Sequence, residues 1–103
     1  MKIFILTDTI AGYEIINFLN QNNEDIVGIA LHPKKHQKNS KETLSIIKTK
    51  NIITLGKKIQ HKEMDFIKKL KPDVILVIFW RFLLDEKFQR IARYGCINFH
   101  IGL

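Results

Sequence analysis

The sequence predicts an α/β fold built on a doubly wound parallel sheet of about five strands. Short apolar runs rich in β-branched residues alternate with segments whose apolar residues recur at helical spacing. The strand-like runs are continuous rather than alternating, which is typical of parallel strands buried on both faces. Helical segments between successive strands indicate right-handed crossovers and therefore parallel neighbours.

Five runs carry the strand signal. The clearest is 73–79 (DVILVIF), which is nearly all apolar and follows Pro72, a residue that cannot continue a helix. Asp8 interrupts the first run, Pro33 follows the second and Gly56 closes the third. The runs are 1–7, 26–31, 51–55, 73–79 and 95–100.

Four helices are expected between these strands. In the third, Met64, Ile67 and Leu70 form one apolar stripe, and lysines at its end complement the helix dipole. Asn39 and Glu42 have the spacing of a capping box at the start of the second. The helical segments are 11–19, 39–49, 64–70 and 84–92.

The composition fits one small domain. The chain has 103 residues, of which 46% are hydrophobic and 26% charged, values ordinary for a packed core and a hydrated surface. No apolar run approaches the length of a membrane span, and the N-terminus lacks the features of a signal peptide. Cys96 is the single cysteine, so an internal disulfide is excluded. We therefore expect a cytoplasmic protein without a membrane partner.

The net charge of +7 is unevenly distributed. Residues 32–71 hold twelve lysines against three acids. Such an excess can attract nucleic acid or a phosphorylated small molecule. A solvated, lysine-rich helix face explains it equally well, and we favour this because aromatic side chains that could stack on bases are scarce there. A small basic nucleic-acid-binding domain is retained as an alternative.

Ligands of an open parallel sheet bind beyond the carboxyl ends of its strands, where the strand order reverses. After the first strand, loop 8–12 holds Asp8, Thr9 and Gly12, a single glycine where a dinucleotide fingerprint needs three. This loop is either a substrate contact or the cap of the next helix. After the fourth strand, residues 79–84 place aromatic side chains and one cation at the edge, where they either bury a flat heteroaromatic ligand or close the core.

The strongest signal is the pair Asn98 and His100, which share one face of a strand because side chains alternate with period two. An amide N–H can stabilise an oxyanion, and an imidazole can move a proton near neutrality. The pair suits acyl transfer to an amine. Cys96 lies on the same face, and we interpret it as a small buried hydrophobe. The remaining histidines show no metal-ligand spacing and are interpreted as surface or loop residues, so no metal site is expected: His32, His36 and His61.

Three stretches together resemble the N-terminal part of the formyltetrahydrofolate-dependent formyltransferases: MKIFILTD, DVILVIFWRFLL and GCINFHIGL. This family includes glycinamide ribonucleotide, methionyl-tRNA and nucleotide-sugar formyltransferases. The resemblance covers essentially the whole chain. It implies that 1–103 is the N-terminal portion of a formyltransferase catalytic domain with a Rossmann-like sheet, incomplete relative to the family.

The resemblance also implies roles for individual residues. Asn98 and His100 match the family's catalytic Asn-x-His, whose third member, an Asp, lies further along the family's chain than this sequence extends. The folate pocket would be lined by Arg81, Phe82 and Leu83, and the segment near the acceptor would hold Asp8, Thr9 and Gly12. Gly102 stands where family members often have a Ser. The implied cosubstrate is N10-formyltetrahydrofolate, with no metal.

The acceptor amine is less well indicated. The loop 32–39 lacks the Gly and Arg typical of the methionyl-tRNA enzymes, and Trp80 with Arg81 looks more like the sugar enzymes. We therefore expect a nucleotide-linked amino sugar and rank methionyl-tRNA below it. We also expect the chain alone to be inactive and its uncovered sheet to favour association with another copy or a missing C-terminal half. The alternative is a fragment or split half that binds only a partner or folate.

Overall fold

The computed structural model describes residues 1–99, which form one five-stranded, all-parallel sheet in the order β3-β2-β1-β4-β5. His100 lies outside the described residues. The predicted α/β class and Rossmann-like, doubly wound arrangement are confirmed. The strands are β1 (Lys2–Thr7), β2 (Asp25–Leu31), β3 (Ile52–Thr54), β4 (Val74–Ile78) and β5 (Cys96–Phe99).

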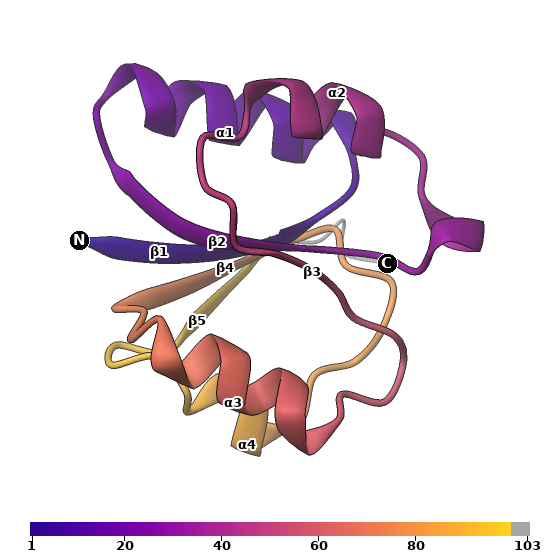
Figure 1. Ribbon diagram of the computed structural model, residues 1–103, viewed down its shortest axis with the longest axis vertical. Coiled ribbons are helices and arrows are strands. Elements are labelled where there is room, and N and C mark those ends of the chain that lie inside the picture. The colour runs from indigo at the N-terminus through magenta and orange to yellow at the C-terminus, as the bar shows by residue number, and fades with distance from the viewer. Residues whose placement is uncertain (100–103) are drawn as a thin grey trace.

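Helices cover both faces of the sheet. Figure 1 shows α1 and α2 on one face and α3 and α4 on the other. A short 3-10 turn, η1 (Lys34–His36), lies in the loop after β2. The helices are α1 (Ile10–Gln21), α2 (Ser40–Ile46), α3 (His61–Lys69) and α4 (Glu86–Gln89). Within residues 1–99, none of them combines the length and apolar content that crossing a membrane requires.

The core has two layers, because successive side chains of a strand point to opposite faces. On β1, Phe4 and Leu6 pack on the face covered by α3 and α4, whereas Ile3 and Ile5 pack on the face covered by α1. Every residue of β4 is buried. The continuous apolar runs of the sequence therefore correspond to strands covered on both sides.

Two helices are shorter than the sequence predicts. The second was expected to reach Thr49, but α2 ends at Ile46, and the Thr49 hydroxyl instead donates to the carbonyl of Val27 at 3.2 Å. Asn39 precedes α2 without the predicted side-chain cap. The fourth helix was expected over 84–92, whereas α4 begins after Asp85, whose Oδ1 accepts the N–H of Phe88 at 2.8 Å.

Gly12 sets how closely α1 approaches the sheet. A Cβ at this position would lie 1.8 Å from Oγ1 and 2.7 Å from Cβ of Thr7, a fully buried residue at the end of β1. The first turn of α1 therefore rests directly on the strand end, which brings loop 8–12 close to the edge where ligands bind.

Substitution of Gly12 tests this contact. Overpacking costs about 1–3 kcal/mol, and a contact of 1.8 Å places the cost at the upper end of that range. Alanine regains about 1 kcal/mol of helix propensity, so Gly12→Ala should lower the free energy of unfolding by about 2 kcal/mol. Gly56→Ala is the matched control, because a Cβ there would meet nothing closer than 3.9 Å. Urea unfolding followed by circular dichroism measures both, and equal effects of the two substitutions would contradict the close contact.

Candidate functional site

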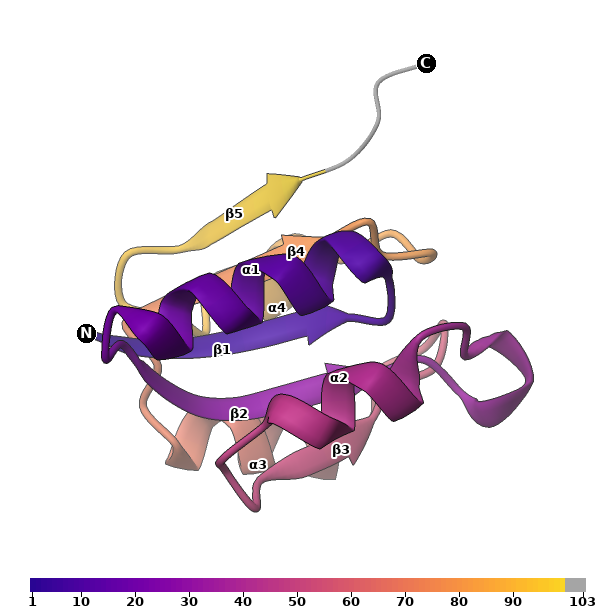
Figure 2. The same cartoon turned by 90° about the horizontal axis from the view of Figure 1, so that it is seen from above.

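The strand order reverses at β1, because the chain runs from β1 to β2 and β3 on one side and returns to β4 and β5 on the other. All five strands are parallel and end at one edge of the sheet (Figure 2). The loops after β1, β2 and β4 therefore meet at the position where doubly wound sheets bind ligands.

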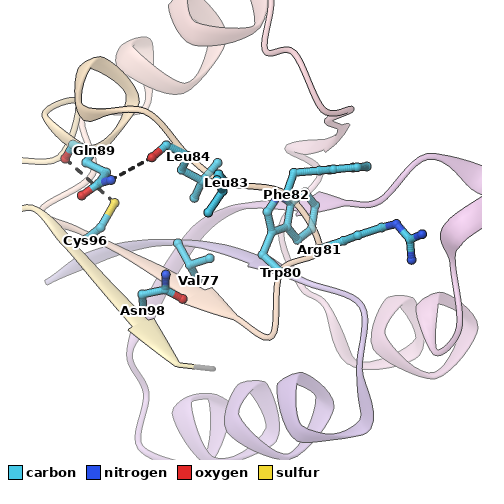
Figure 3. A pocket seen from close by; sticks show the side chains of 9 residues that line it. All are labelled: Val77, Trp80, Arg81, Phe82, Leu83, Leu84, Gln89, Cys96 and Asn98. Atoms are coloured by element: carbon cyan, nitrogen blue, oxygen red, sulfur yellow. Dashed lines mark hydrogen bonds between the residues drawn. The ribbon is translucent and has the colours of Figure 1, made fainter. Parts of the chain in front are cut away.

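A cavity of about 590 Å³ opens at this edge, on the face covered by α3 and α4. Its volume lies within the usual range for sites that bind small molecules. Figure 3 shows Asn98 and Val77 on one side of it and residues 80–84, the cavity loop, on another. The lining residues are Val77, Trp80, Arg81, Phe82, Leu83, Leu84, Gln89, Cys96 and Asn98.

Asn98 reaches this cavity because of its register on β5. It pairs with Val77 of β4, and neighbours in parallel strands point to the same face. The Asn98 side chain is exposed, so its amide is accessible to a ligand. The parity argument therefore placed Asn98 at a cavity, although its catalytic role stays a prediction, as does that of His100.

Cys96 differs from our interpretation. It is only half-buried, and it lines the same cavity as Asn98 rather than lying deep in the core. Its Sγ lies 3.9 Å from the carbonyl oxygen of Gln89. Burial raises the pKa of the Cys96 thiol to about 11, which keeps it protonated and unreactive near neutrality.

A strained turn precedes the cavity loop. Phe79 has φ of 51°, in the left-handed region, and its N–H donates to the carbonyl of Phe99 at 2.7 Å. The chain then turns so that Trp80 stacks on His32 and Leu83 is 98% exposed at the mouth of the cavity. Arg81, Phe82 and Leu83, the predicted folate contacts, all line the cavity, and their binding of a cofactor stays a prediction.

Each predicted acceptor contact in loop 8–12 has a structural role. The Thr9 hydroxyl accepts the N–H of Gly12 at 3.2 Å and caps α1, and Gly12 packs on β1. Asp8 is 1% exposed, and its Oδ2 accepts the N–H of Lys38 at 2.7 Å, which ties the loop after β1 to the loop after β2. Substrate contacts by these residues stay a prediction.

His32 is a second residue whose environment the sequence reasoning misjudged. It was interpreted as a surface or loop histidine, but it is 5% exposed at the end of β2. Its ring stacks on Trp80 with centroids 3.9 Å apart and meets the edge of Phe82 at 5.9 Å. Its Nε2 accepts the N–H of Arg81 at 3.0 Å. The one sequence feature that could have indicated its burial was its position directly after a buried strand.

The electrostatics around His32 favour its neutral form. Burial lowers the pKa of His32 from its ordinary value of 6.5, and the positive charges of His36 and Arg81 lower it further. The carboxylate of Asp8, whose Oδ2 lies 3.6 Å from Nδ1, acts in the opposite direction. Among residues 1–99, no three His, Cys, Asp or Glu side chains gather as metal ligands.

Comparison with known proteins gives a match to one named class of enzyme. The chain is 50% identical over 40 residues to the methionyl-tRNA formyltransferase of Francisella tularensis subsp. novicida. It is 48% identical over 40 residues to the enzymes so named in the subspecies tularensis and holarctica. The resemblance to the formyltransferases is thereby confirmed for part of the chain. The matched residues make up 39% of this chain and 13% of each relative, and no family model matches.

The names of these relatives differ from the acceptor class that the sequence led us to expect. These relatives are named for methionyl-tRNA, whereas loop 32–39 led us to expect a nucleotide-linked amino sugar. None of the three relatives named above is a nucleotide-sugar enzyme.

The cavity thiol provides a test of this local environment. A pKa of about 11 against 9.0 for a free thiol leaves about 100-fold less thiolate near pH 8. Alkylation of Cys96 by iodoacetamide should therefore be at least about 100-fold slower in the folded protein than in concentrated urea. Mass spectrometry of quenched samples measures both rates, and similar rates would show that Cys96 is not held in an apolar environment.

Proposed function

We propose that residues 1–103 form the N-terminal portion of a formyltransferase catalytic domain, which transfers a formyl group from N10-formyltetrahydrofolate to the amine of methionyl-tRNA. The observation that carries the proposal is the 50% identity over 40 residues to a methionyl-tRNA formyltransferase. The cavity beside Asn98 supports it independently, because its residues fit the donor.

The fit rests on the chemistry of the lining. Apolar and aromatic side chains form much of the cavity wall, as a flat pterin ring requires. Trp80 and Phe82 contribute the aromatic part of this wall. Arg81 supplies a cation that suits the carboxylates of a folate. In Figure 3 its guanidinium extends away from Asn98, which separates the charged end of the site from the reacting end.

The donor brings a formyl carbon bonded to N10. In the proposed reaction the amine nitrogen attacks this carbon, the new N–C bond forms, and the C–N10 bond breaks. One proton leaves the attacking amine and one is taken up at N10. The Asn98 amide N–H donates to the formyl oxygen as negative charge develops on it, which favours the transition state over the bound substrate. No covalent nucleophile is needed, consistent with the protonated Cys96 thiol.

The acceptor would approach from the edge formed by the loops after β1 and β2. The loop after β2 carries Lys34, Lys35 and Lys38, a positive surface suited to phosphates. A tRNA and a nucleotide-linked sugar both carry phosphate, so this charge does not choose between them. The named relatives favour tRNA.

Donor binding tests the cavity. We expect 5-formyltetrahydrofolate, a stable analogue, to quench the fluorescence of Trp80, the single tryptophan. Leu83→Ala removes an exposed side chain that a bound pterin would cover and should weaken binding about tenfold, the effect of losing about 1.5 kcal/mol of apolar burial. Leu44→Ala, a partly exposed leucine on α2 and outside the cavity, is the matched control. An unaltered affinity of Leu83→Ala for 5-formyltetrahydrofolate would show that the donor does not bind in this cavity.

Formyl transfer tests the reaction and the acceptor together. In a longer protein that also carries the third catalytic residue, methionyl-tRNA should be formylated in preference to a nucleotide-linked amino sugar. Asn98→Ala in that protein should lower the rate about 100-fold, as for loss of an oxyanion donor. Asn17→Ala on α1 is a control on the opposite face of the sheet. Radiolabelled formyl incorporation measures both acceptors. Transfer to the sugar alone would overturn methionyl-tRNA as the proposed acceptor. Donor binding without transfer would instead support an inactive, folate-binding half.

A further inference from the structure

The cavity wall depends on one buried imidazole. The His32 node consists of the side chains of Asp8, His32 and Trp80 and the backbone N–H groups of Lys38 and Arg81. It joins the loops after β1, β2 and β4, which are far apart in sequence: Asp8 and Lys38 are 30 residues apart, and His32 and Arg81 are 49 apart.

The hydrogen bonds of the node define the proton positions on His32. Because Nε2 accepts the N–H of Arg81, it carries no proton in this arrangement. The single ring proton of the neutral imidazole is then on Nδ1, which faces Oδ2 of Asp8 at 3.6 Å. That oxygen accepts the Lys38 N–H, and its negative charge close to Nδ1 favours the tautomer that leaves Nε2 free to hold the cavity loop.

The node also fixes two side chains that line the cavity. The His32 ring stacks on Trp80 with an interplanar angle of 15° and meets the edge of Phe82. His36 meets the same Phe82 ring from η1, also at 5.9 Å. His32 itself is not among the cavity-lining residues, so any effect of this imidazole on a ligand is exerted through the loop.

We propose that His32 is a positioning residue whose neutral imidazole holds the cavity loop in its binding shape, so that protonation of His32 loosens the loop and weakens ligand binding. A proton on Nε2 places two N–H donors against each other across 3.0 Å, and the contact with Arg81 cannot persist. The loop then moves, together with Trp80 and Phe82. The ligand part of this inference rests on the proposed function, whereas the movement of Trp80 does not.

The charges that face His32 set the direction of the pH dependence. Asp8 faces it from the loop after β1, His36 from η1 and Arg81 from the cavity loop. Burial is the largest influence and lowers the pKa of His32 below 6.5, so the node is intact at neutral pH. Because the pKa is lower in the folded state than in the unfolded state, neutral His32 stabilises the fold above about pH 6.5. This contribution is lost as the pH falls through the folded-state pKa.

The fluorescence of Trp80 can report the state of the His32 node in the absence of any ligand. Acidification from about pH 7 to about pH 4 should change the Trp80 emission and increase its quenching by acrylamide, because the stacked imidazole becomes a cation and the loop opens. His32→Gln keeps a side-chain acceptor for the Arg81 N–H but cannot titrate, so this transition should disappear. His61→Gln, an exposed histidine on α3, should leave it unchanged. Far-UV circular dichroism confirms that each variant is folded at each pH.

Ligand binding provides the second readout. In the wild type, affinity for 5-formyltetrahydrofolate should fall about tenfold on protonation of His32, as for loss of one well-formed hydrogen bond. His32→Gln should bind almost independently of pH, and His32→Leu, which lacks an acceptor, should bind weakly even near pH 7. A Trp80 transition that persists in His32→Gln would overturn the role of His32. Absence of folate binding alongside a His32-dependent Trp80 transition would overturn the proposed ligand and leave the loop mechanism supported.

Discussion

Burial of the central strand β1 on both faces is the constraint on which the rest of the structure depends. Residues 3–7 of this strand are all buried, and the strand pairs with β2 on one side and β4 on the other. Hydrophobic burial on two faces requires a layer of helices on each. When the strands are parallel and the crossovers right-handed, helices cover both faces only if the chain reverses its direction across the sheet, and here it does so at β1. The close approach of α1 at Gly12 follows from the same packing.

The reversal has a direct consequence for the site. It brings three loops to one edge without any sequence-local interaction between them. Their relative positions depend on a few polar contacts: Asp8 binds the backbone of the loop after β2, and His32 binds the backbone of the cavity loop. Such contacts are strong in a buried setting and costly to leave unpaired. The shape of the ligand cavity is therefore linked to the protonation of a residue that lies outside it.

The cavity and Asn98 lie together because β5 pairs with β4 in a register that points Asn98 and Val77 to the same face. This arrangement places an amide donor beside a surface that mixes apolar and aromatic side chains with polar groups, a combination compatible with the formyl transfer that we propose. The similarity to methionyl-tRNA formyltransferases over 40 residues is consistent with that chemistry. The backbone register thus places the Asn98 amide beside the cavity that we propose as the donor site.

The sequence by itself determined the order and type of the elements and the face on which Asn98 lies, because hydrophobic periodicity and strand parity are local properties. It did not determine where α2 ends, because the Thr49 hydroxyl donates to the carbonyl of Val27 in β2. It also did not determine where α4 begins, because Asp85 accepts the N–H of Phe88 and caps the helix there. It offered only weak signals for two residues: His32 directly follows a buried strand, and Cys96 shares a strand face with Asn98. Neither signal predicted that His32 is buried or that Cys96 lines the cavity. Those outcomes were decided by the tertiary structure, because the groups that enclose His32 come from distant parts of the chain and meet only when the sheet forms.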